Sequence, residues 1–209
     1  MKYIDVTLTL ESGMRGVEFT PAKTVGKDGW NAQTLHLYSH CGTHMDAPLH
    51  FEVNNDTIDD LPPERFFTLC HVIHLEGIKP KSEIEINDLG QVEKAIKRGE
   101  GLIFRTGWSR LVNEPKYRDD LPGISRDLAL WCVDNGVAVI GVEPPSVADV
   151  NNLDHLTEIH RILLGGGVVI VEGLANLDQI TKQKVTLVAM PLKIKNGDGA
   201  PCRAVVIEE

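Results

Sequence analysis

The sequence predicts a mixed α/β domain, on three observations. In the first third of the chain, apolar and polar residues alternate with the period of a β-strand, as at Ile4, Val6 and Leu8. From about residue 87 the apolar residues recur at helical spacing, and each helical segment is followed by a short apolar run. Strands first and alternating helices and strands afterwards are typical of a single mixed-sheet α/β domain.

Size and composition also predict one domain over residues 1–209. A chain of 209 residues can bury a sizeable core without disulfides or structural metals. Hydrophobic residues make up 42% of the chain and charged residues 24%, close to an average globular protein and unlike a disordered one. We therefore expect the chain to fold unaided.

The first third of the chain is predicted to consist of strands joined by exposed loops. The alternation covers Ile4 to Leu10 and again Thr34 to His40, which predicts two strands. Between them, Ser12 to Trp30 carries several glycines, one proline and few apolar residues, a composition typical of a long loop outside the core. Such a loop could cover a substrate. Asn54 to Pro63 is predicted to be another exposed connection.

Caps and glycines mark the helix ends in the second part of the chain. A helix that starts behind Asn87 or Asp88 should end at Gly99, and the next should end at Gly136. The triglycine at 165–167 leads from a helix into a strand, whereas phosphate-binding loops lead from a strand into a helix, so we expect a tight turn there. The expected helices cover about residues 88–98, 125–135 and 153–164, and the expected strands residues 102–104, 137–142, 168–171, 185–190 and 203–207.

Charge and cysteine content narrow the classes of function. A formal net charge of −9 disfavours binding to nucleic acid or to an anionic membrane, so a small-molecule substrate is expected. No apolar run approaches the roughly 18 residues needed to span a bilayer, and the first residues lack the long apolar segment of a signal peptide. The four cysteines are widely spaced and are predicted to be reduced, which fits a cytoplasmic protein.

Three histidines and an aspartate fall within eleven residues: His40, His44, Asp46 and His50. Imidazole and carboxylate are the ligands that zinc and other first-row divalent ions prefer when thiolates are absent. A straight strand would separate His40 from His44 by roughly 13 Å. The chain must therefore turn back between them, and Gly42 is placed to allow it. A polar strand edge that carries three histidines by accident is the alternative.

Glu172 is a second candidate, because it follows an apolar strand, where an unpaired buried carboxylate would be costly. A bound metal would remove that cost, and a glutamate exposed at the strand end is the alternative. The remaining histidines are predicted to be bystanders, since a single histidine is more often a surface or satisfied core residue than a ligand. These are His36, His71, His74 and His155.

The segment from His40 to His50 matches the pattern His-x-Gly-Thr-His-x-Asp-x-Pro-x-His, and with it the sequence resembles the cyclase family of metal-dependent hydrolases, which includes bacterial kynurenine formamidases. Weaker matches lie at residues 3–8, 105–108, 143–146, 160 and 172–177, so that the resemblance extends over nearly the whole chain. It implies the swivelling β/β/α fold of that family and a homodimer or higher homo-oligomer.

The resemblance also implies the roles of the site residues. It makes His40, His44 and Asp46 metal ligands, with Asp46 bridging two ions, and it adds His160 and a bridging Glu172 further along the chain. It makes His50 the proton donor and acceptor. Two zinc ions per chain are expected, with manganese as the alternative, because histidine and carboxylate ligands suit both.

The expected reaction is hydrolysis of an amide or formamide C–N bond by a metal-activated hydroxide, as in arylformamidases. In kynurenine formamidases, enzymes of tryptophan catabolism, a tryptophan of the first loop contacts the aryl substrate. Here Gly13 to Phe19 lacks a tryptophan and carries Arg15 and Glu18. Two alternatives therefore stay open: a hydrolase that opens a cyclic amide such as isatin or a lactone, and a non-catalytic metal-binding protein.

Overall fold

The computed structural model describes residues 1–209 and shows a seven-stranded mixed barrel with helices on its outside. The barrel closes because β12 pairs with both β11 and β4, while β1 (Lys2–Asp5) adds to the outer edge of β12. In order around the ring the strands are β12 (Gly199–Glu208), β11 (Lys184–Pro191), β5 (Phe67–His74), β7 (Gly101–Arg105), β9 (Val139–Val142), β10 (Val169–Glu172) and β4 (His44–Asp46). The predicted mixed α/β class is confirmed.

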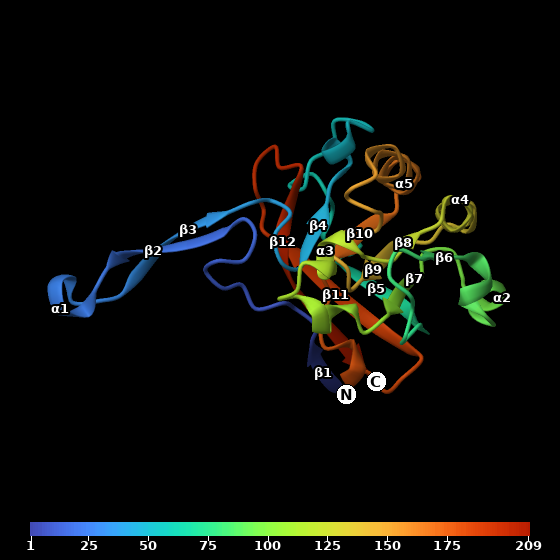
Figure 1. Cartoon of the computed structure of the whole chain (residues 1–209), viewed down its shortest axis with the longest axis horizontal. Coiled ribbons are helices and arrows are strands. Elements are labelled where there is room, and N and C mark those ends of the chain that lie inside the picture. Colours follow the sequence, from blue (N-terminus) through green and yellow to red (C-terminus); the bar gives the residue numbers. More distant parts are fainter.

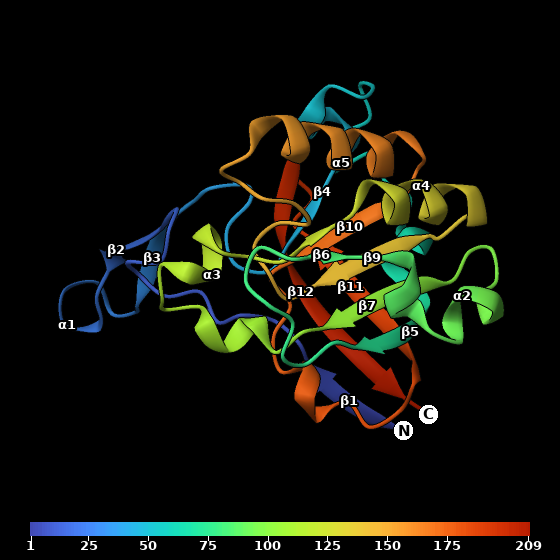
Figure 2. The ribbon, with the colours of Figure 1, turned by 45° about the vertical axis from the view of Figure 1, so that its right-hand side comes forward.

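The barrel is parallel on one side and antiparallel on the other. Strands β5, β7, β9 and β10 run parallel, and β4, β11 and β12 pair antiparallel. Parallel neighbours need crossovers, and α2 (Val92–Ala95), α4 (Arg126–Asn135) and α5 (Leu153–Gly165) provide them. Helices α4 and α5 pack side by side over the parallel strands, as Figure 2 shows.

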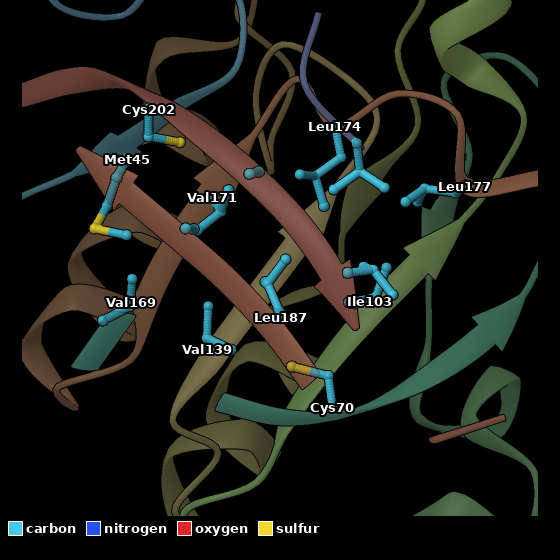
Figure 3. Close-up of a cluster of buried hydrophobic side chains, with 14 of the residues drawn as sticks. Met45, Cys70, Ile103, Val139, Val169, Val171, Leu174, Leu177, Leu187 and Cys202 are labelled. Atoms are coloured by element: carbon cyan, nitrogen blue, oxygen red, sulfur yellow. The ribbon is translucent and has the colours of Figure 1, made fainter. Parts of the chain in front are cut away.

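Alternating residues of the parallel strands contribute to two cores. Cys70, Ile103 and Val171 face the barrel interior in a cluster of 21 buried residues, drawn in part in Figure 3. Their neighbours Phe104 and Ile170 face outward into a second cluster, of 19 buried residues, beneath α4 and α5. Because both faces of these strands are buried, they are short apolar runs, as the sequence predicted for residues 102–104, 137–142 and 168–171.

The two long helices form close to where the sequence places them. The Ser125 hydroxyl accepts a hydrogen bond from the Leu128 amide at the start of α4, and Gly136 ends that helix with φ 67°. Asn152 caps α5 in the same way, and the triglycine turn follows it, with Gly167 at φ 76°. The turn leads directly into β10, which confirms the predicted tight turn.

The prediction of a long loop over residues 12–30 is wrong in part. Strand β2 (Val17–Lys23) pairs antiparallel with β3 (Ala32–Leu37) around the single turn α1 (Val25–Asp28). This hairpin projects from the barrel (Figure 1), and Val17 is the one buried residue of its two strands. With so little surface buried, β2 does not need the alternation that indicates a half-buried strand.

Three other expected boundaries differ from the structure. The predicted helix at 88–98 is a 3₁₀ turn over Ile86–Leu89 followed by the short α2, because Gly90 lies between them with φ 56° and ψ −126°. The strands expected at residues 4–10 and 34–40 end at Asp5 and Leu37. Strand β5 was not predicted, because Cys70 to Ile73 are all buried and the segment shows no alternation.

The remaining elements are short. They are the paired strands β6 (Glu83–Ile84) and β8 (Gly123–Ile124), helix α3 (Lys116–Asp119), and 3₁₀ turns at Pro48–Phe51, Pro63–Phe66, Trp108–Leu111 and Leu177–Gln179. No helix combines the length and the apolar character that crossing a membrane requires. The four cysteines are buried free thiols, as predicted.

Candidate metal centre

Strand pairing brings the early histidine segment to the late helix–strand unit. Strand β4 lies antiparallel beside β10, with His44 directly opposite Glu172. On its other side β4 pairs with β12, with Asp46 opposite Gly199. Residues separated by more than a hundred positions in the sequence therefore meet at one end of the barrel.

The chain turns back between His40 and His44, as predicted. Gly42 has φ 58°, a left-handed conformation that glycine adopts without strain. The Thr43 hydroxyl fixes the turn, because it donates to the Gly173 carbonyl at 2.5 Å and accepts from the Leu8 amide at 2.8 Å. As a result the His40 and His44 rings lie 5.2 Å apart, centroid to centroid.

Two carboxylates lie between the imidazoles of the cluster. His44 Nε2 is 3.1 Å from Glu172 Oε2 and 3.8 Å from Asp46 Oδ1. His160, on α5, places Nε2 3.6 Å from Asp46 Oδ2 and 3.4 Å from Glu172 Oε1. His40 Nδ1 is 2.9 Å from Asp46 Oδ1. The structure thus brings all five predicted ligand residues together, and their role as ligands stays a prediction.

Backbone carbonyls set the orientation of two of the imidazoles. His44 Nδ1 lies 3.0 Å from the Gly42 carbonyl oxygen, and His160 Nδ1 lies 2.7 Å from that of Leu156. Since a carbonyl only accepts, each Nδ1 carries a proton, and each Nε2 faces the carboxylates. This is the arrangement found in metal-binding histidines, whose second nitrogen donates to the protein.

Within the cluster, the histidines stabilise the ionised carboxylates, and the carboxylates stabilise the protonated form of His40. Burial opposes ionisation of Asp46, but the hydrogen bond and charge of His40 outweigh it and hold the Asp46 pKa below its usual range. Burial and the Asp46 charge act against ionisation of Glu172 as well, but His160 and His44 lower its pKa overall. For His40, burial lowers the pKa, but the hydrogen bonds to Asp46 and Asp198 prevail and raise it to about 9.

The donor set fits a divalent cation. His44 Nε2 and Asp46 Oδ2 are buried and have no hydrogen-bond partner, and leaving such atoms unpaired is costly. Potential ligand atoms gather in two groups, and within each group they lie within 4.8 Å of one another. One group is His40, Asp46 and His50, and the other is His44, Asp46 and Glu172. Asp46 belongs to both, as a residue that bridges two ions would.

His50 lies at the edge of the cluster, on the 3₁₀ turn Pro48–Phe51. Its ring stacks on that of His40 at a centroid distance of 3.7 Å, and its Nδ1 is 3.6 Å from Asp198 Oδ2. The side chain keeps 23% of its surface exposed, against 2% for His44. Burial lowers the pKa of His50, in contrast to the raised pKa of His40.

A cavity of about 840 Å³ opens onto the cluster. Its lining includes His44, His160 and Glu172 as well as the aromatic side chains of Tyr38 and Phe51. Residues 12–15, from the segment expected to cover a substrate, also line it, together with Glu11. The side chains that could bind a metal ion and a space for a small molecule therefore lie together.

Sequence reasoning missed Asp198, whose Oδ2 lies 3.0 Å from His40 Nε2. In the sequence this aspartate stands among Asn and Gly residues that indicate only a turn, so no local signal marks it. The four histidines expected to be bystanders lie outside the cluster: His71 pairs with Glu100 at 2.8 Å, and His155 lies 3.7 Å from Glu83.

The chain is similar to known proteins in sequence and in fold. The profile of the family described as "Putative cyclase" matches residues 4–149. The chain is 32% identical to a kynurenine formamidase of Salinibacter ruber over 188 residues, 90% of this chain and 85% of that protein.

Isatin hydrolase A from Labrenzia aggregata, solved with benzyl benzoate, has a similar fold, with a TM-score of 0.89 and 24% identity over 98% of this chain and 93% of that one. A structure described as a "potential metal-dependent hydrolase with cyclase activity" aligns with a TM-score of 0.80 and 24% identity over 100% and 99% of the two chains.

Proposed function

Because this chain belongs to the Putative cyclase family, we propose that it is a metal-dependent hydrolase that cleaves an amide or formamide C–N bond, as arylformamidases do. The observation that carries the proposal is the convergence of His44, Asp46 and Glu172 with His40 and His160 beside a cavity. Two buried carboxylates without a lysine or arginine partner in the cluster fit a site built around cations.

The cation-binding residues of the proposed site are His40, His44, Asp46, His160 and Glu172. Zn²⁺ is the expected ion and Mn²⁺ the alternative, because imidazole and carboxylate ligands suit both. When bound, a divalent cation supplies Lewis-acid polarisation of a carbonyl group and eases the ionisation of water. Asp46 and Glu172 return two negative charges, and the Val147 amide donates to Glu172 Oε1 at 2.6 Å, which keeps that carboxylate in place.

His50 is the proposed proton donor and acceptor. It lies at the edge of the cluster, is partly exposed and lines the cavity, so that it can reach a substrate. Its Nδ1 faces Asp198, which leaves Nε2 as the nitrogen that exchanges a proton with the leaving nitrogen of the amide.

The proposed substrate is an arylformamide, in keeping with the similarity to kynurenine formamidase, and the apolar and aromatic part of the cavity wall suits an aryl group. A cyclic amide is the second candidate. It is favoured by the segment that lines the cavity at residues 11–15, which carries Met14 and Arg15 and no aromatic side chain.

Elemental analysis of the purified protein combined with a substrate panel tests this function. The panel contains N-formylkynurenine, a formyl-anilide, isatin and a lactone. We expect bound Zn²⁺ or Mn²⁺ and turnover that disappears with a chelator and returns with the metal. Tight metal binding without turnover of any panel member would favour a non-catalytic metal-binding protein, and absence of metal binding would refute the proposal.

A further inference from the structure

Asp198 is a charged residue of the site that the proposed ligand set leaves out. It lies in the loop between β11 and β12, on the far side of His40 from Asp46. We propose that Asp198 is a positioning residue, whose carboxylate holds the His40 ring so that Nδ1 faces the cation position beside Asp46. This inference rests on the proposed function, because it assigns a residue that sets the cation affinity of the same site.

The His40 ring spans two carboxylates. Its Nδ1 lies 2.9 Å from Asp46 Oδ1, and its Nε2 lies 3.0 Å from Asp198 Oδ2. A histidine that binds a cation through Nδ1 must carry its proton on Nε2, and a carboxylate that accepts this proton fixes both the tautomer and the ring orientation. Asp198 stands where such an acceptor is needed.

The loop holds Asp198 in place although its side chain is 43% exposed. The Asp198 carbonyl accepts from the Ala47 amide at 2.9 Å, and the preceding Gly197 carbonyl accepts from the Ile58 amide at 2.8 Å. At Gly199 a Cβ would lie 2.6 Å from Cε1 of His40, so only glycine allows the loop to approach the ring this closely. Both sides of Asp198 are therefore anchored at the site.

His40 differs from His44 and His160 in the group that lies next to the ring nitrogen facing away from Asp46. In His44 and His160 this nitrogen is Nδ1, and it lies next to a backbone carbonyl, which no substitution of a side chain removes. His40 alone of the three depends on a side chain, and that side chain is charged. A carboxylate acceptor increases the electron-donating strength of the imidazole more than a carbonyl does, so the affinity for the cation should depend on Asp198.

Two substitutions separate the carboxylate from its hydrogen-bonding geometry. Asp198→Ala removes the acceptor, and Asp198→Asn keeps an amide oxygen that can still accept from Nε2. Asp178→Asn, at an exposed position of the 3₁₀ turn Leu177–Gln179, removes the same charge from a residue whose one ion pair is a 4.0 Å contact with Arg110. Thermal unfolding of each variant checks that the fold is kept.

The affinity of chelator-treated protein for Zn²⁺, measured by competition with a chromogenic chelator, is the first readout. We expect Asp198→Ala to weaken binding about 10- to 100-fold, Asp198→Asn to recover part of the loss, and Asp178→Asn to match the unsubstituted protein. The second readout is the ¹⁵N spectrum of histidine-labelled, zinc-loaded protein, in which His40 should carry its proton on Nε2 and lose this preference in Asp198→Ala.

The outcomes distinguish this inference from the proposed function. If the unsubstituted protein binds Zn²⁺ tightly and Asp198→Ala binds it equally well with an unchanged His40 spectrum, the role of Asp198 is refuted and the metal site stands. If the unsubstituted protein binds neither Zn²⁺ nor Mn²⁺, the proposed function and the role of Asp198 both fail.

Discussion

At the scale of single residues, the site differs from an ordinary buried polar cluster because some of its buried nitrogen and oxygen atoms have no hydrogen-bond partner. His44 Nε2 and Asp46 Oδ2 are buried, and neither has a hydrogen-bond partner. In a purely structural network these atoms would be paired, because an unsatisfied buried polar group costs about 1–3 kcal/mol. The cost is consistent with a cluster that is completed by a cation.

Removing the imidazole of His50 should separate catalysis from metal binding. His50→Ala is expected to keep the metal content of the unsubstituted protein and to lower kcat about 10²- to 10⁴-fold, the usual contribution of general acid–base catalysis. Elemental analysis and steady-state kinetics on the same preparation check this. Loss of metal from the variant would instead make His50 a ligand, which its distance to the His40 and Asp46 group allows.

Removing the Glu172 carboxylate should reduce metal binding, in contrast to removal of the His50 imidazole. Its two oxygens face His44 at 3.1 Å and His160 at 3.4 Å, so Glu172→Ala is expected to reduce the amount of metal bound per chain. Glu158→Ala, on the exposed side of α5, is the matched control and should leave the metal content unchanged. Equal metal content in Glu172→Ala and the control would rule out the ligand role.

At the scale of elements, the barrel strands carry a second, partly buried ionic cluster away from the cavity. Glu100, just before β7, accepts from Lys184 of β11 at 2.6 Å and pairs with His71 of β5 at 2.8 Å. Burial raises the pKa of Glu100, but these hydrogen bonds outweigh it and lower the pKa from 4.5 to about 2. The cluster ties three strands together and shares no residue with the metal centre.

This shift predicts a pH dependence of stability. Because the pKa of Glu100 is lower in the folded state than the ordinary value of 4.5, its contribution is complete above that pH and is lost as the pH falls toward 2. Glu100→Gln should lower the free energy of unfolding by roughly 1–3 kcal/mol near pH 6. In urea unfolding between pH 6 and pH 3, the two proteins should converge. A constant difference would contradict the assignment.

Some elements near the site are short, so the sequence gives little indication of them. Strand β4 has three residues, His44 to Asp46, which is too short for any periodic signal. Its place between β10 and β12 depends on register with two strands more than a hundred residues away. Strand β2 of the hairpin likewise escaped prediction, because it buries little surface.

At the scale of the whole molecule, the cation should contribute to the stability of the fold. A ligand that binds only the folded state adds about 2.7 kcal/mol when its concentration is 100 times Kd. For a domain of this size each kcal/mol raises Tm by about 2–4 °C, so Zn²⁺ or Mn²⁺ should raise the Tm of chelator-treated protein by roughly 5–10 °C. Differential scanning fluorimetry measures this.

The matched control for the thermal shift is Glu172→Ala, in which the rise should be clearly smaller. Mg²⁺ provides a further comparison, because it prefers oxygen ligands over imidazole. An absence of any shift with Zn²⁺ and Mn²⁺, in protein that unfolds cooperatively, would contradict the metal site. The expected homodimer and cytoplasmic location stay predictions.

The sequence by itself determined the fold class, the two long helices with their caps, and the histidine segment from His40 to His50. These are local properties, because caps, periodicity and motif spacing act within one or two turns of chain. The tertiary structure alone decided the closure of the barrel through β12 and β4, the register that sets His44 opposite Glu172, and the position of Asp198 against His40. Those features depend on contacts between distant segments, whose free energy is gained only when the strands pair and the core closes around them.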